Sequence, residues 1–398
     1  MTTSASPPRA HWLELDVLRM LAVALMVANH AGVAWLSPEA RSRGISGALT
    51  FAGSFAPVLF FCVTGMGRGI RAGADSAGSG WATWRKAGLL ALADAAMWLS
   101  PTRWLGLDFL GFIALSSLVV DGIARRLRWR ALTSLALLGC LALRFGVGPA
   151  LGSHLPVLLE SAIVRFVLGV EGVAGVSYPL SPWLAFPLLG MLAARFAAGR
   201  LTASAASRPR LVAGCAVAAL VLGFACVALD ARGAVFFRWG TMSFGYFVAS
   251  IGVLAAAFVA GLALAPVASH ARLRPLLTIG GSASLIVVPV HYGVVALLGN
   301  LWKPVPGGAF VCMMVAALVA TVATARGIDR AAPALASARS SRSLAALWAV
   351  VIGGLLACAL GRGGLPRVPV EVVVQIAVAC LFVRASRPAA RMESASVD

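Results

Sequence analysis

Charged residues are scarce in this chain of 398 residues. Asp, Glu, Lys and Arg together make up 12%, and only 14 residues are acidic. Hydrophobic residues make up 60%, and the mean hydropathy is +0.91. Soluble domains carry about 25% charged residues. This composition therefore excludes a soluble enzyme and predicts a protein that crosses the membrane many times.

The signatures of several well-known chemistries are missing. The chain has no G-x-x-x-x-G-K-[ST] loop for nucleotide hydrolysis, no H-E-x-x-H motif and no Cys/His spacing typical of zinc. No segment resembles the elbow that presents a nucleophilic serine. The 7 cysteines are an odd number in apolar segments, so we expect buried packing residues and no disulfide framework. We expect no metal.

The formal net charge of +19 resembles that of a nucleic-acid-binding protein, but its placement indicates otherwise. The basic residues are almost all Arg, and they cluster between apolar runs. This pattern is typical of the cytoplasmic loops of membrane proteins. We therefore expect the lipid bilayer as a partner and no nucleic acid.

The apolar runs predict an all-α fold, a polytopic integral membrane helix bundle of about ten to twelve transmembrane helices, because each span needs about 20 apolar residues. We expect a single membrane domain over residues 1–398, with a composition typical of a linker at 326–343. With the N-terminus in the cytoplasm, about two thirds of the 33 Lys and Arg lie on that side, so both termini are expected there. The approximate spans are 16–36, 49–67, 87–100, 107–124, 131–150, 182–198, 211–229, 243–266, 278–299, 308–325, 344–361 and 369–383.

The first span, LDVLRMLAVALMVANHAGVAWL (15–36), contains Arg19 and, eleven residues later, His30. At about 100° per residue, eleven steps return to within about 20° of the start, so both lie on one helix face about 16 Å apart. Asp16 lies near the same stripe. Ionisable residues in membrane helices usually face a bundle interior or a water-filled cavity. The pair therefore predicts a polar path through the membrane.

Each of these residues has a functional and a structural interpretation. His30 is either a general base, because neutral imidazole titrates near working pH, or a histidine at the membrane interface. Arg19 either binds the phosphates of an anionic cytosolic cofactor through its planar fork or snorkels to the inner head groups.

His291 is a second candidate, in TIGGSASLIVVPVHYGVVALLGN (278–300). Pro289 should kink this span and free a carbonyl, to which a purely structural histidine would bind. Asp108 opens the fourth span, where it could simply cap the helix. Arg68 lies where positive charge is expected on the cytoplasmic side.

Five segments together resemble the transmembrane acyltransferase superfamily, which includes acyltransferase-3 proteins and heparan-α-glucosaminide N-acetyltransferase-like proteins. Arg19 and His30 match the Arg-to-His spacing of the acyltransferase-3 first helix, although the Gly that usually follows the Arg is Met20 here. The segments are ELDVLRMLAVALMVANHAG (14–32), APVLFFCVTGMGRGI (56–70), LDFLGFIALSSLVV (107–120), YPLSPWLAFPLLGMLAARF (178–196) and GGSASLIVVPVH (280–291).

The resemblance implies an acyltransferase of the bacterial inner membrane, with a core over about 12–300 and extra spans over about 308–383. It would move an acyl group, acetyl above all, from cytosolic acyl-CoA (acetyl-CoA) to a hydroxyl or amino group of an extracytoplasmic glycan or glycolipid. The residues then expected are His30 and His291 for catalysis, Arg19 and Arg68 for the CoA phosphates, and Asn29, Asp108, Tyr178 and Trp183 for the acceptor.

The acceptor site is expected between the outer ends of the first and ninth spans, under the loop at 150–181. Two other functions stay open on the residues alone. The same Arg and His residues could serve a transporter or flippase of an amphiphilic anion, or the chain could be a membrane partner without activity.

Overall fold

A computed structural model describes residues 12–41, 43–70, 80–154, 160–169, 173, 175–203, 207–230, 242–280, 283–302, 305, 307–337, 341–361 and 367–386. Within these residues the regular structure is helical, and β structure is limited to isolated bridges. This agrees with the bilayer as solvent, where a helix satisfies its own backbone hydrogen bonds.

Each of the twelve predicted spans is mostly helical over its described residues. In chain order the elements are α1 (Leu13–Trp35), α2 (Pro38–Arg41), α3 (Gly44–Gly53), α4 (Ala56–Gly69), α5 (Gly80–Trp98), α6 (Phe109–Ala124), α7 (Trp129–Ala142), η1 (Leu143–Val147), α8 (Gly148–His154), α9 (Ala162–Leu168), α10 (Leu180–Trp183), α11 (Ala185–Ala203), α12 (Ser207–Asp230), α13 (Phe244–Ala268), α14 (Arg274–Leu277), α15 (Ala283–Leu301), α16 (Gly307–Ser337), α17 (Ser341–Leu360) and α18 (Arg367–Ser386).

Among the described residues, 7 helical stretches are long and apolar enough to cross a membrane. Shorter apolar helices at Phe109–Ala124, Leu180–Arg195, Val212–Leu222 and Val368–Phe382 account for four further predicted spans. The remaining one, α5, carries Arg85, Lys86 and Asp94. The prediction of an all-α polytopic membrane bundle is confirmed.

The expectation of a linker at 326–343 was wrong for most of its length. Helix α16 continues to Ser337, and α17 begins at Ser341. The segment is rich in alanine, the best helix former. Arg326 also donates to the backbone oxygen of Thr278 at 2.5 Å, which ties this part of α16 to the loop before α15.

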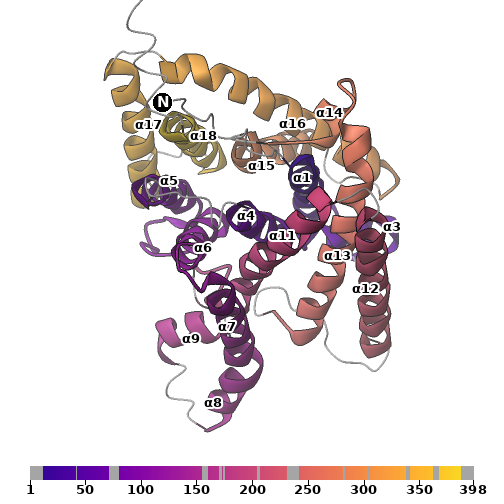
Figure 1. Cartoon of the computed structure of the whole chain (residues 1–398). Coiled ribbons are helices and arrows are strands. Elements are labelled where there is room, and N and C mark those ends of the chain that lie inside the picture. Colours follow the sequence, from indigo (N-terminus) through magenta and orange to yellow (C-terminus); the bar gives the residue numbers. More distant parts are fainter. Residues whose placement is uncertain are drawn as a thin grey trace, which may run out of the picture.

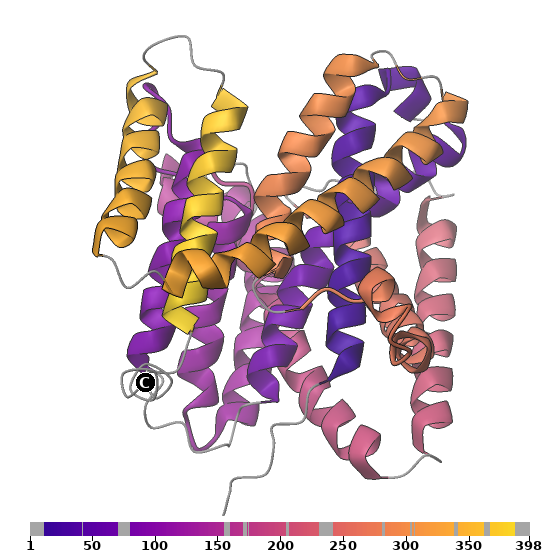
Figure 2. The ribbon, with the colours of Figure 1, turned by 90° about the horizontal axis from the view of Figure 1, so that it is seen from above.

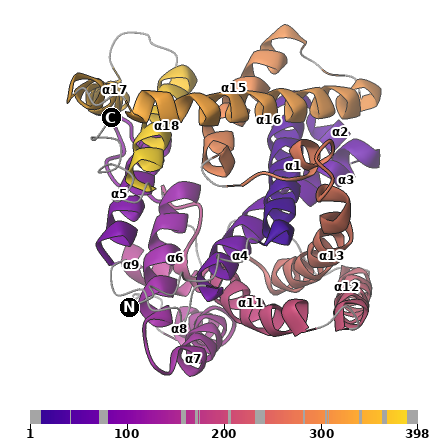
Figure 3. The ribbon, with the colours of Figure 1, turned by 45° about the horizontal axis from the view of Figure 1, so that its top comes forward.

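Helices α1 and α4 lie in the middle of the bundle (Figure 1). Helix α1 packs on α3, α4, α13, α15 and α16, and α4 packs on α6 and α11. The long helix α16 runs obliquely across its neighbours in Figure 2 and extends over α15 and α18 in Figure 3. The last helix, α18, packs on α17, α5 and α15. The helical hairpin of α17 and α18 therefore covers the side of the bundle formed by α5 and α15.

The crossing of α4 and α11 brings backbone against backbone. A Cβ added to Gly65 would overlap the carbonyl oxygen of Pro187, and one added to Gly190 would overlap the carbonyl oxygen of Cys62. In lipid the hydrophobic effect does not drive helices together. Small residues at a crossing let the two backbones approach closely, so that van der Waals packing holds the helices together. This contact fixes α4 beside the first turns of α11.

We expect Gly190→Ala to destabilise the protein by about 1–3 kcal/mol, because the added methyl group must push two backbones apart. The midpoint of thermal unfolding in detergent measures this loss. The control is Gly139→Ala on α7, where an added Cβ meets nothing within 4 Å. Its midpoint should stay or rise, since Ala favours helix. Equal midpoints for both variants would contradict close packing at Gly190.

Candidate active site

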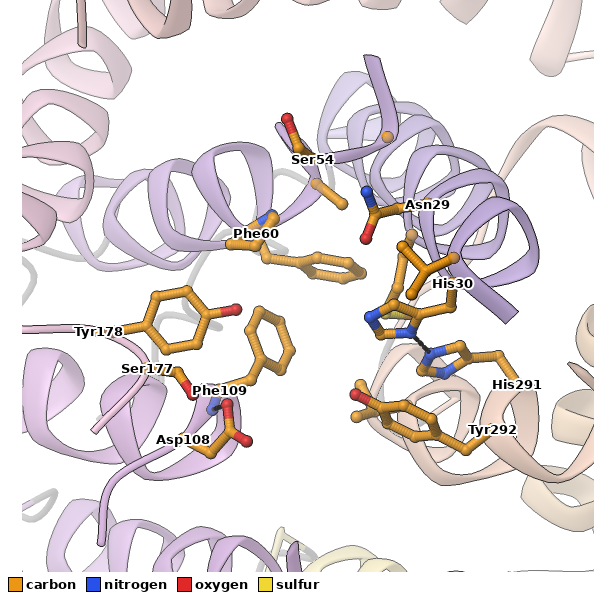
Figure 4. Close-up of a pocket in the computed structure, with 16 residues that line it drawn as sticks. Asn29, His30, Ser54, Phe60, Asp108, Phe109, Ser177, Tyr178, His291 and Tyr292 are labelled. Atoms are coloured by element: carbon orange, nitrogen blue, oxygen red, sulfur yellow. Dashed lines mark hydrogen bonds between the residues drawn. The ribbon is translucent and has the colours of Figure 1, made fainter. Parts of the chain in front are cut away.

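A cavity of about 440 Å³ lies among α1, α4, α6, α15 and the segment before α10. Figure 4 shows His30, His291 and Tyr292 on one side of it, with Asp108, Ser177 and Tyr178 across from them. Its lining residues are Met26, Asn29, His30, Val33, Gly53, Ser54, Ala56, Pro57, Phe60, Asp108, Phe109, Ser177, Tyr178, Val288, His291 and Tyr292.

Two imidazoles from distant parts of the chain are in direct contact here. Nδ1 of His30 lies 2.6 Å from Nε2 of His291, although the two residues are 261 positions apart. Close by, Trp35 Nε1 donates to the backbone oxygen of Val295 at 2.9 Å. The residue numbers of the contacts increase along both helices, from His30 and His291 to Trp35 and Val295, so α1 and α15 run in the same direction. This direction is expected for a first and a ninth span, and the predicted approach of these two spans is observed.

The hydrogen bonds determine which nitrogen of each imidazole carries a proton. Nδ1 of His291 lies 3.2 Å from the backbone oxygen of Val287, which can only accept, so this nitrogen donates. In a neutral imidazole the other nitrogen, Nε2, then accepts, and Nδ1 of His30 is the donor to it. This assignment leaves Nε2 of neutral His30 with a free lone pair, the form that a general base requires.

The free nitrogen of His30 faces the cavity. In Figure 4 the ring nitrogen that makes no bond to His291 points toward the open space between Phe60 and Asp108. Tyr292 stacks on the His30 ring, with centroids 4.8 Å apart and an interplanar angle of 26°. His291 itself is 0% exposed. His291 and Tyr292 together therefore hold the orientation of His30.

The opposite wall is formed where the segments before α6 and α10 pair. Leu107 and Val176 form a parallel bridge, with Leu107 N donating to Gly175 O at 2.8 Å and Ser177 N donating to Leu107 O at 2.9 Å. The next residue, Asp108, caps α6 by accepting from Phe109 N at 2.8 Å. The predicted cap is thus present, and the same carboxylate also lines the cavity.

Tyr178 is a further polar residue of this wall, beside Ser177, and it is 5% exposed. Burial raises the pKa of its phenol well above the ordinary value, so the hydroxyl stays neutral and can donate. Trp183 packs edge-on against it, with ring centroids 4.9 Å apart. Trp183 is 0% exposed and is not among the residues that line the cavity, so it supports Tyr178 and offers no surface to an acceptor.

Asn29 lies beside His30 on α1 and also lines the cavity. Its amide donates to the backbone oxygen of Thr50 at 2.9 Å, which orients the side-chain oxygen. Ser54 lines the cavity at the break between α3 and α4. The hydroxyl of Tyr246 donates to the Ser54 backbone oxygen at 2.7 Å and holds this break in place.

A smaller cavity of about 70 Å³ contains Arg19, with Thr64 and Ser284 among its other lining residues. It shares Phe60, Phe109 and Val288 with the larger cavity. A cavity therefore lies beside each end of the polar face predicted along α1, one at Arg19 and one at His30. The side chains of Phe60, Phe109 and Val288 separate the two cavities.

The two predicted phosphate ligands are both held by carboxylates. Arg19 pairs with Asp16 at 2.5 Å. Arg68 pairs with Asp121 at 3.0 Å, and Asp121 also takes Arg125 at 2.6 Å. Each guanidinium has five N–H donors, so these pairs orient the groups and leave donors for other ligands. Arg68 lies at the end of α4 and lines neither cavity.

Sequence reasoning missed Tyr292, Ser177 and Ser54 in the cavity wall. The low number of tyrosines could have indicated Tyr292, because the chain has only 3 Tyr. Tyr178 and Tyr292 line the cavity, and Tyr246 lies directly behind it. Among the described residues no group of three His, Cys, Asp or Glu side chains could hold a metal ion.

A comparison with protein families adds to this geometry. The catalytic region of heparan-alpha-glucosaminide N-acetyltransferase matches residues 12–223, more than half of the chain. The chain belongs to this family. It is therefore a membrane acetyltransferase, and the recognised resemblance is confirmed. No curated protein and no solved structure matches the chain. The match includes His30 and Asp108 but ends before His291.

We expect His291→Ala to lower acetyl transfer by about 10²-fold, the effect of misplacing a catalytic group by an ångström. The reason is that His30 loses the acceptor of its Nδ1–H and can rotate. The loss should appear in kcat, with little change in KM for either substrate, because the expected role of His291 is to hold His30 in position.

The matched control is His270→Ala, since His270 is exposed and bonds only locally to the Val267 backbone oxygen among the described residues. Its kcat and KM should equal those of the unmodified protein. An unchanged kcat for His291→Ala would show that His30 needs no positioning partner.

Proposed function

We propose that this acetyltransferase takes the acetyl group from cytosolic acetyl-CoA and transfers it to a hydroxyl or amino group of an extracytoplasmic glycan or glycolipid. The observation that carries the proposal is the free nitrogen of His30 in a cavity that adjoins a second cavity at Arg19. A base at one end and a guanidinium at the other suit a donor and an acceptor that arrive from opposite sides.

The orientation rests on the distribution of positive charge. About two thirds of the 33 Lys and Arg fall in loops on the side of the N-terminus, which would be the cytoplasmic side of the bacterial inner membrane. Both termini would then be cytoplasmic, and Arg19, Arg68 and Arg125 would lie toward that side. His30 would lie toward the outer face.

The basic cluster would bind the donor from the cytoplasm. Arg19 and Arg68 would contribute charge-assisted hydrogen bonds to the CoA phosphates, with Asp16 and Asp121 holding their forks in position. The thin pantetheine arm would follow α1 from the smaller cavity into the larger one. Phe60, Phe109 and Val288 would have to separate for it to pass.

In the larger cavity the residues would divide the chemistry. His30 Nε2 would remove the proton from the acceptor hydroxyl or amine as its oxygen or nitrogen bonds to the acetyl carbonyl carbon. The neutral hydroxyls of Tyr178 and Tyr292 and the amide of Asn29 would orient the acceptor and the carbonyl oxygen. As the carbon–sulfur bond breaks, His30 would return the proton to the sulfur, so CoA leaves as the thiol.

The test is incubation of the purified protein in proteoliposomes with acetyl-CoA radiolabelled in the acetyl group, with and without methyl glucosaminide as acceptor. We expect label in the amino sugar, or release of labelled acetate when water replaces it. Uptake of the sugar or of CoA without label transfer would favour a transporter and overturn the proposal.

His30→Ala should lower acetyl transfer by about 10²–10⁴-fold, the usual effect of removing a general base. Binding of CoA, measured by calorimetry, should stay unchanged because His30 lies in the cavity at the other end of the path from Arg19. The His270→Ala variant serves as the control for loss of an imidazole. Near-normal turnover in His30→Ala would remove His30 from the mechanism.

Arg19→Lys should weaken acetyl-CoA binding by about tenfold despite the retained charge, because an ammonium cannot present a planar fork. The matched control is Arg43→Lys, at an exposed position near the opposite end of α1, which should bind like the unmodified protein. If calorimetry gives equal affinities for both variants, Arg19 has a structural role in its pair with Asp16.

A further inference from the structure

A third cavity, of about 680 Å³, forms a groove between α5 and α6 that the acetyl-transfer mechanism does not use. On α5 its lining residues include Trp84, Gly88, Ala91, Asp94 and Trp98, which recur every three or four positions and so share one face. Fourteen residues separate Trp84 from Trp98. At 1.5 Å per residue the groove follows α5 for about 21 Å.

The wall contributed by α6 is apolar as well. Gly111, Ala114, Leu115 and Leu118 line it, again at the spacing of one helix face. An added Cβ at Gly88 would meet nothing within 4 Å, whereas Gly111 lies against the Asp94 carboxylate. Ala162 and Phe166 of α9 complete the apolar lining, so the groove is long enough and apolar enough for a hydrocarbon chain.

One end of the groove is polar because of Asp94, which is 2% exposed. Its Oδ2 accepts from Trp98 Nε1 at 3.1 Å and from Asp108 N at 2.8 Å. The backbone N–H of Gly111 also lies close to the carboxylate, and Oδ1 has no donor at good hydrogen-bond geometry within the described part of the chain. A buried oxygen without a donor is costly, and a donor on a bound molecule would remove that cost.

This polar end is separated from the active site by one layer of backbone. Leu107 and Val176, the bridged pair, line the groove, while the following residues, Asp108 and Ser177, line the active-site cavity. Alternate side chains of extended backbone point to opposite faces, so the same two short segments form one wall of each space.

We propose that the α5–α6 groove binds the hydrocarbon chain of a membrane lipid whose head group donates a hydrogen bond to Asp94. Lipid is the occupant because the groove belongs to a membrane bundle and, apart from Asp94, its lining on α5, α6 and α9 is apolar. Its rim is apolar, with Leu105 84% exposed and Trp84 63% exposed. The tail lies along α5 toward Trp84, and the head lies beside Trp98. The site does not depend on the proposed acetyl transfer.

Photo-crosslinking of the intact protein in liposomes tests both the site and its polarity. The probe is phosphatidylglycerol with a diazirine at the end of one acyl chain, and a second probe carries the diazirine close to the head. We expect peptide mapping to place the tail-end label near Trp84 and Leu118, and the head-end label near Trp98 and Leu107. The reverse pattern, or no label on α5 and α6, overturns the proposal.

Phosphatidylcholine with the same labelled chain is the matched probe for the head group, because its head lacks a hydrogen-bond donor. It should label α5 and α6 severalfold less than phosphatidylglycerol does. Equal labelling by the two lipids would overturn the assignment of the head group to Asp94. Neither comparison requires a variant.

Gly88→Leu should fill the groove and reduce the phosphatidylglycerol label on α5 and α6 severalfold. The matched control is Gly139→Leu on α7, where an added Cβ likewise meets open space. Its label on α5 and α6 should equal that of the unmodified protein. Undiminished labelling in Gly88→Leu, with a normal unfolding midpoint, would place the lipid outside the groove.

Discussion

The hydrogen bond between His30 and His291 is the contact on which the rest of the site depends. Two imidazoles at membrane depth each need partners, because water is not there to supply them. Here each supplies the other, at 2.6 Å, and the chain of donors ends on the Val287 backbone oxygen. This arrangement requires α1 and α15 to lie side by side in the same direction. The packing of the two helices therefore also determines which nitrogen of His30 carries the proton.

Other polar groups in the bundle also find their hydrogen-bond partners within the protein. Asp16 holds Arg19, Asp121 holds Arg68, and Asp94 accepts the backbone N–H of Asp108. Each pair joins a candidate functional residue to the carboxylate of a neighbouring residue. Positive charge therefore lies toward one end of α1 and the imidazole of His30 toward the other. Under the proposed function, this separation would suit a donor that carries phosphates at one end and an acceptor that loses a proton at the other.

The sequence predicted what depends on a single helix. Spans follow from runs of about 20 apolar residues, and the common face of Arg19 and His30 follows from 3.6 residues per turn. The prediction of a linker at 326–343 gave too little weight to the alanines of this segment, which favour the helix that α16 continues to Ser337. Sequence reasoning also placed Trp183 at an acceptor surface, where the structure buries it behind Tyr178. Whether an aromatic side chain faces a cavity or is buried behind another residue depends on the neighbouring helices. The local sequence does not show how those helices pack.

The wall between the groove and the active site connects these observations. It consists of two short extended segments, and its stability depends on Asp94, which accepts from Asp108 N and Trp98 Nε1. Asp108 in turn caps α6 and faces the cavity that holds His30. Asp94 therefore bonds to the backbone of the residue whose own carboxylate caps α6. Because the groove and the active-site cavity share this wall, a shift of Asp94 is transmitted to Asp108 through one hydrogen bond.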